Sequence, residues 1–189
     1  MLTPDEATTA LREAHRVRAL GRRLVHGQTT RLPLVWWGAA WMVTYPAAQA
    51  LPFALALVAA IATSAAAFAM TKLGARWDPM PGRTGWEGHV MRAWWAVLVG
   101  AFVVDVMAAP APTPVLFLIP GALWGLAMLL YAVVAEDRAL GVLGAGIAVL
   151  AAALRLFLLD ESLVLFGLLG GGGMVAVGLL RILGLPGRR

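Results

Sequence analysis

The chain has 189 residues, of which 61% are hydrophobic and only 13% charged, with a formal net charge of +5. A soluble domain carries about 25% charged residues, and a single core cannot hide so much apolar surface from water. The composition therefore excludes a soluble globular protein and predicts an all-α integral membrane protein. The absence of cysteine excludes disulfides, thiol redox chemistry and cysteine-ligated metals.

The beginning of the chain predicts a basic amphipathic helix over residues 4–26, too polar to cross a bilayer. Apolar side chains recur there at three- and four-residue steps, and Gly27 follows as a C-cap. With its linker the helix forms a cytoplasmic segment, residues 1–31. Lipid phosphate accounts for its positive charge, so nucleic acid is not an expected partner. The candidate residues for binding anionic headgroups or a protein partner are Arg12, Arg16, Arg22 and Arg23.

Six apolar stretches follow, and each is about as long as the roughly 20 residues that a bilayer requires. Lipid offers no partner for loose backbone groups, so all six are expected to be helices. Together they form a transmembrane domain, residues 32–183, before a short cytoplasmic tail, residues 184–189. The predicted spans are 32–51, 52–70, 93–109, 115–134, 139–159 and 163–183.

The distribution of arginine predicts the orientation of these spans. The first, third and fifth connections between spans, at 48–53, 109–114 and 160–162, contain no lysine or arginine. The N-terminal segment, the other two connections and the tail all do. The positive-inside rule therefore predicts cytoplasmic N- and C-termini. The high ratio of arginine to lysine is typical of a GC-rich bacterial genome, so we expect a multi-pass protein of the bacterial cytoplasmic membrane.

Asp105 lies within the third apolar stretch. A charge facing lipid is costly, so Asp105 is expected to face the helix bundle. It lies roughly 20 Å along its helix from Arg92, and Arg155 lies roughly 26 Å along the fifth helix from Arg138, at 1.5 Å per residue. The similar depths predict an ion pair between Asp105 and Arg155.

Other polar side chains share the depth of Asp105 and predict a polar pocket in the outer half of the bundle. The candidate lining is Tyr45, Gln49, Asp105, Arg155 and Asp160. Two readings of the charged pair stay open: an ion pair that only fixes the positions of the helices, and a site for a ligand or proton.

A run of glycines marks the sixth span: Gly167, Gly170, Gly171, Gly172 and Gly173. Small residues allow helices to approach closely, so the run predicts tight packing or association of copies. The alternative is a segment that unwinds in mid-membrane, as transporters use to bind substrates or ions.

Motifs for catalysis are absent from the sequence. There is no HExxH, no GxSxG, no P-loop and no glycine-rich dinucleotide turn. The loop after the second span holds Asp78, Glu87 and His89, which are too few and too loosely spaced for a metal site. We therefore expect a protein that is not an enzyme and has no metal or cofactor.

Two functions remain open from the sequence. The first is a small transporter, or transporter-like small-molecule-binding protein, working as a homo-oligomer through the outer polar pocket. The second is a regulatory or accessory protein that binds a cytosolic partner through the N-terminal helix and the 73–92 loop. The layout is similar to that of membrane-bound regulators that hold a cytosolic transcription factor, a similarity of topology alone.

Overall fold

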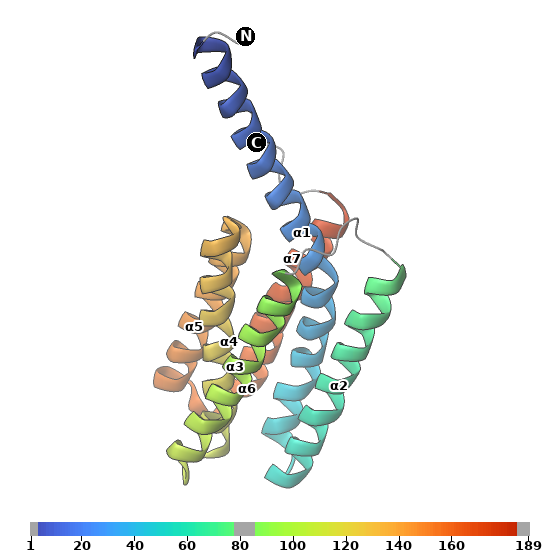
Figure 1. Ribbon diagram of the computed structural model, residues 1–189. Helices are drawn as coiled ribbons and strands as arrows, with labels where there is room; N and C mark the ends of the chain where they lie inside the picture. The colour runs from blue at the N-terminus through green and yellow to red at the C-terminus, as the bar shows by residue number, and fades with distance from the viewer. Residues whose placement is uncertain (1–3, 78–85, 185–189) are drawn as a thin grey trace.

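The computed structural model describes residues 4–77 and 86–184, with side chains placed for residues 11–14, 30–74 and 92–184. Within these ranges the protein consists of helices and contains no strand (Figure 1). The elements are α1 (Pro4–Ala50), α2 (Phe53–Trp77), α3 (Trp86–Ala108), α4 (Thr113–Ala135), α5 (Arg138–Phe157), the 3-10 turn η1 (Leu159–Glu161), α6 (Ser162–Phe166), the π-helical turn η2 (Gly167–Gly171) and α7 (Gly172–Ile182).

Four helical segments of the described chain are long and apolar enough to cross a membrane. They are Phe53–Gly74, Thr113–Ala135, Arg138–Phe157 and Leu159–Ile182. Large apolar side chains cover the outside of the bundle, including Val58 on α2, Phe102 on α3 and Val142 on α5. Water would penalise this exposure, whereas lipid tails would solvate it. The helical class and the membrane-embedded character predicted from composition agree with this arrangement.

The N-terminal helix is longer than the sequence pattern predicts. The prediction that it ends at Gly27 is wrong, because α1 continues without interruption to Ala50. A single glycine costs only about 1 kcal/mol in a helix, which is not enough to end one that neighbouring helices stabilise. Its 47 residues give a length of roughly 70 Å. The N-terminal half projects beyond the other helices, while the C-terminal half enters the bundle (Figure 1).

The C-terminal half of α1 is the centre of the bundle. Leu34, Trp41, Tyr45 and Ala48 are all buried there. This half packs on α2, α4, α6, η2 and α7, while α4 and α5 form a closely packed hairpin. Among the described residues, α2 packs mainly on α1 and α3 mainly on α4. The two helices α2 and α3 are therefore the least enclosed.

The glycine run of the last span keeps its helical winding. Gly167–Gly171 form a π-helical turn between α6 and α7, so the chain widens locally but does not unwind. Two of these glycines lie against α1: a Cβ on Gly171 would be 2.6 Å from the Gly38 carbonyl oxygen, and one on Gly167 would be 2.9 Å from Pro46 Cδ. Gly170 faces Trp41, Gly173 faces Leu143, and Gly172 has open space around it. The close approach of α1 to η2 therefore depends on particular glycines of the run.

Polar contacts define the two ends of the bundle. At one end Gln49, near the end of α1, donates to the Asp160 carbonyl at 2.7 Å and accepts from the Leu163 N–H at 3.2 Å. At the other end Arg181 of α7 contacts Asp137 and Thr30. The α1–α2 turn thus lies beside the α5–α6 connection, and the α4–α5 turn beside the C-terminal end of α7.

Candidate functional site

Asp105 lies on the packed face of α3. From Arg92 to Ala108 the side chains that are not exposed recur at three- and four-residue steps: Trp94, Val97, Ala101, Asp105 and Ala108. This spacing places them on one side of the helix, the side that packs on α4. Asp105 therefore faces the bundle, with small alanines one turn before and one turn after it. Its Oδ1 atom is buried and has no hydrogen-bond partner.

Tyr45 of α1 is an aromatic side chain that bears on this carboxylate. Tyr45 is buried, and it interacts electrostatically with Asp105. Its hydroxyl lies against α4, since a Cβ on Gly121 would be 2.7 Å from the Tyr45 Oη atom. The absence of a side chain at Gly121 thus makes room for the hydroxyl. Tyr45 of α1 and Asp105 of α3 thus both pack towards α4.

Aromatic rings surround Tyr45. Its ring centroid lies 4.8 Å from that of Phe166, 5.3 Å from that of Trp41 and 6.3 Å from that of Phe117. The Tyr45–Phe166 and Tyr45–Phe117 pairs are edge-on, an arrangement that aromatic rings favour. Phe117 also contacts Phe53, with 6.5 Å between centroids. Because Phe53 is 48% exposed and Tyr45 only 5%, the rings lead from the surface into the core.

The predicted ion pair between Asp105 and Arg155 is not formed. Arg155 is exposed in the last turn of α5, and the buried oxygen of Asp105 has no partner. The helical rise gives a residue's depth along its helix but not the direction in which it points, and α4 packs against both helices. Arg155 therefore does not complete the site, and its exposed position is typical of a side chain that extends to the membrane surface.

Of the other predicted pocket residues, Gln49 and Asp160 are brought together. The contact uses the Asp160 backbone carbonyl, while the exposed Asp160 carboxylate plays no part in it. Gln49 also accepts the N–H of Leu163. These hydrogen bonds hold the end of α1 to the start of α6, which gives Gln49 a structural role at this end of the bundle.

Sequence reasoning missed a charged cluster at the opposite end. One guanidinium nitrogen of Arg181 donates to both carboxylate oxygens of Asp137 at 2.8 Å, and the other donates to the Thr30 hydroxyl. The Arg181 and Asp137 side chains are only 8% and 14% exposed. Asp137 also caps α5 by accepting the Leu140 N–H at 3.1 Å. The signal was present in the sequence, because Arg181 lies inside an apolar stretch and such a charge needs a partner.

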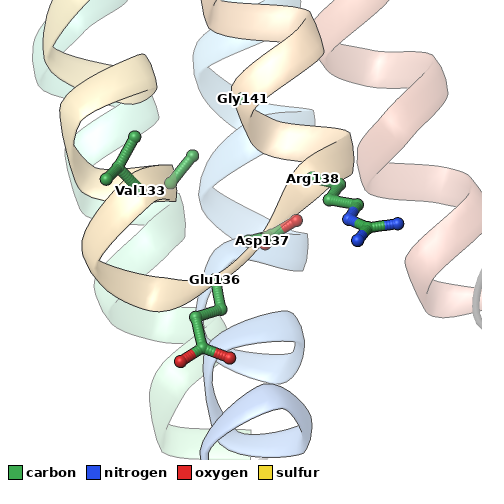
Figure 2. A pocket seen from close by; sticks show the side chains of 6 residues that line it. Val133, Glu136, Asp137, Arg138 and Gly141 are labelled. Atoms are coloured by element: carbon green, nitrogen blue, oxygen red, sulfur yellow. The ribbon is translucent and has the colours of Figure 1, made fainter.

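A shallow hollow of about 340 Å³ opens beside this cluster, along the α4–α5 turn. Figure 2 shows Glu136 and Arg138 pointing in different directions from the turn, with Asp137 between them in the chain. The remaining lining is Ala132, Val133 and Gly141. The charged side chains of the turn do not point towards one position in the hollow, so the hollow lacks the arrangement of a binding site.

The remaining predicted sites are only partly described. Arg12 is exposed on the projecting part of α1, whereas the side chains of Arg16, Arg22 and Arg23 lie outside the described residues. Asp78 and the side chains of Glu87 and His89 also lie outside them. Among the described residues, no group of three or more histidine, aspartate or glutamate side chains could hold a metal ion.

Comparisons with protein families, with curated proteins and with solved structures found no match for this chain. The arrangement of residues therefore carries the functional argument alone.

Proposed function

We propose that the protein crosses the bacterial cytoplasmic membrane six times, with both termini in the cytoplasm. Four segments qualify as spans by length and hydropathy. The apolar half of α1 and the helix α3 lie alongside them in the bundle (Figure 1). Tryptophan, tyrosine, proline and glutamine lower the hydropathy of α1, yet its C-terminal half packs on α2, α4, α6, η2 and α7. The arginines of the N-terminal segment and of the α4–α5 turn support the orientation.

The function that the site supports best is that of a small transporter or small-molecule-binding membrane protein, with Asp105 and Tyr45 as its binding residues. The observation that carries this proposal is the buried Oδ1 atom of Asp105, which has no hydrogen-bond partner although it lies on a packed helix face. A carboxylate oxygen left without a partner in an apolar bundle is costly, and a ligand that donates to it would relieve the cost. Ionisable residues inside membrane spans are functional candidates for this reason.

The attachment of α3 supports a site that can open. Among the described residues α3 packs mainly on α4, and Ala101 is its one fully buried side chain between Arg92 and Ala108. Few interactions would have to break for α3 to shift and admit a ligand beside Asp105. Binding without chemical conversion agrees with the absence of catalytic motifs in the sequence.

Native mass spectrometry tests this proposal. The full chain is extracted into lipid nanodiscs and the masses of bound molecules are measured, together with the number of protein copies. We expect a small molecule on the wild-type protein and its loss in Asp105→Asn. Asp160→Asn is the matched control, because Asp160 is an exposed carboxylate at the same end of the bundle. A small molecule that remains bound in folded Asp105→Asn would refute the site.

A second candidate function is a regulatory or accessory protein that binds a cytosolic partner. The continuity of α1 favours it, because the projecting half of this helix would stand away from the membrane (Figure 1). In this reading its arginines bind an acidic surface, of a protein or of lipid headgroups, together with residues 73–92. Deleting residues 1–26 would release a specific cytosolic partner while the bundle stays folded. If no partner depends on these residues, this candidate fails.

A further inference from the structure

Aromatic rings join α4 to α1 and α4 to α3. At one end Trp124 of α4 contacts both Trp94 of α3 and Trp37 of α1, with ring centroids 4.6 and 5.2 Å away. Towards the other end lie Trp41, Tyr45 and Phe117. We refer to these six rings as the aromatic seam: Trp37, Trp41, Tyr45, Trp94, Phe117 and Trp124.

Asp105 is the one charged residue of the apolar segments that form this seam. Residues 32–51, 93–109 and 113–134 contain no other Asp, Glu, Lys or Arg. Arg155, the predicted partner, lies exposed on α5. A carboxylate in this place attracts a positive charge, and no cation of the three segments supplies it. A positively charged ligand would supply the missing counter-charge to Asp105.

Aromatic faces favour the same kind of ligand. The face of an aromatic ring carries partial negative charge and attracts organic cations, most strongly where water is excluded. The rings of Phe53, Phe117 and Tyr45 form a row that leads inward from the surface, with neighbouring ring centroids 6.5 and 6.3 Å apart. On its helix face Asp105 is flanked by two small side chains, Ala101 and Ala108.

We propose that the ligand of the Asp105–Tyr45 site is an organic cation with an apolar body, of the quaternary ammonium or phosphonium class. Its charge pairs with Asp105 and its apolar groups pack on the rings of the aromatic seam. The proposal rests on the function proposed above and names the class of molecule that this site takes. An anion would face Asp105 unfavourably, and a neutral apolar molecule would leave the carboxylate unpaired.

Two probes of the same shape and opposite charge test the proposal: tetraphenylphosphonium and tetraphenylborate. Binding of each is measured on the full chain in nanodiscs by the change in tryptophan fluorescence, with protein-free nanodiscs as the control for lipid partitioning. We expect saturable binding of the phosphonium only. Asp105→Asn is expected to weaken it about tenfold or more, and Asp160→Asn to leave it unchanged.

Aromatic variants keep the test decisive if Asp105→Asn does not fold. Phe117→Leu keeps the carboxylate and removes one ring of the row, so it is expected to weaken phosphonium binding severalfold. Equal binding of both probes, no saturable phosphonium binding, or binding unchanged in Asp105→Asn would each overturn the proposal. Should the molecule found by native mass spectrometry depend on Asp105 but be neutral or anionic, the site would stand and the cation class would fail.

Discussion

Arg155 and Arg181 both lie in the last turn of an apolar helix, and their surroundings differ completely. Arg155 is exposed, whereas the Arg181 side chain is 8% exposed and paired with Asp137. Both oxygens of one carboxylate accept from the same guanidinium nitrogen, and Thr30 binds the other nitrogen. The pair joins α7 to the α4–α5 turn and, through Thr30, to α1. We therefore expect the pair to stabilise the packing of these three segments against one another.

Replacing Asp137 by asparagine isolates the ion pair, because asparagine still caps a helix. Arg181 would then be left buried without its counter-charge, and we expect the free energy of unfolding to fall by about 3 kcal/mol. Thermal unfolding in detergent followed by tryptophan fluorescence measures the loss. Arg155→Gln is the control and should change stability by less than about 0.5 kcal/mol.

The double variant Asp137→Asn with Arg181→Leu completes this test. Removing both partners of a buried pair costs less than removing one, because no uncompensated charge remains. We expect the double variant to recover most of the stability lost in Asp137→Asn. If Asp137→Asn is as stable as Arg155→Gln, the ion pair does not stabilise the bundle.

Single residues show where sequence reasoning succeeds and where it stops. The cost of a charge in lipid predicts that Asp105 faces the bundle, and Asp105 does lie on the packed face of α3. The same cost does not identify a partner, because similar depth on two helices leaves their rotation undetermined. Depth alone predicts Arg155 as the partner, yet Arg155 is exposed on α5. The pair Asp137–Arg181 joins residues 44 positions apart, and only the packing of α7 beside the α4–α5 turn brings them together.

The close contact between α1 and η2 depends on glycines that face each other across the two helices. A Cβ on Gly171 would lie 2.6 Å from the Gly38 carbonyl oxygen and 3.1 Å from the Met42 nitrogen. Backbone atoms cannot move aside as a flexible side chain can. The neighbouring Gly172 has no atom within 4 Å of its Cβ position and an ordinary helical conformation. A side chain is therefore expected to fit at Gly172 but not at the adjacent Gly171.

Gly171→Ala is expected to lower the free energy of unfolding by about 1–3 kcal/mol, since the methyl group must push α1 away. Gly172→Ala is the matched control and should stabilise the protein by up to about 1 kcal/mol, because alanine favours the helix more than glycine does. Unfolding in a series of increasing denaturant concentrations compares the two variants. Equal stability of both would mean that α1 and η2 are not in close contact.

Helix existence was predictable and helix boundaries less so. The apolar stretches identify all the helices of the bundle, since lipid leaves the backbone no alternative. Gly27 shows the limit: its sequence context matches a helix end, yet α1 passes through it and through Pro33. A local stop signal worth about 1 kcal/mol cannot outweigh the packing of the buried half of α1. The π-helical turn at Gly167–Gly171 lies against α1, and no local sequence pattern predicts that contact.

At the scale of the whole molecule, the hydrogen bonds of Gln49 bear on the number of spans. They hold the end of α1 beside Asp160, so the α1–α2 turn and the α5–α6 connection lie at the same end of the bundle. If only the four segments that qualify by hydropathy crossed the membrane, these two connections would lie on opposite sides of it. With six spans they lie on the same side. The two topologies therefore make opposite predictions for one pair of positions.

Single cysteine substitutions distinguish the six-span from the four-span topology, and the chain contains no cysteine of its own to interfere. Leu51→Cys and Glu161→Cys place a thiol at exposed positions of the two connections, and Ala139→Cys places one on the exposed start of α5. We expect a membrane-impermeant maleimide to label the first two in intact cells and the third only after the membrane is permeabilised. Four spans would instead place Leu51→Cys and Ala139→Cys on the same side and Glu161→Cys on the other. Labelling of Ala139→Cys alone in intact cells would keep six spans but invert the orientation, and would move Asp105 to the cytoplasmic half of the bundle.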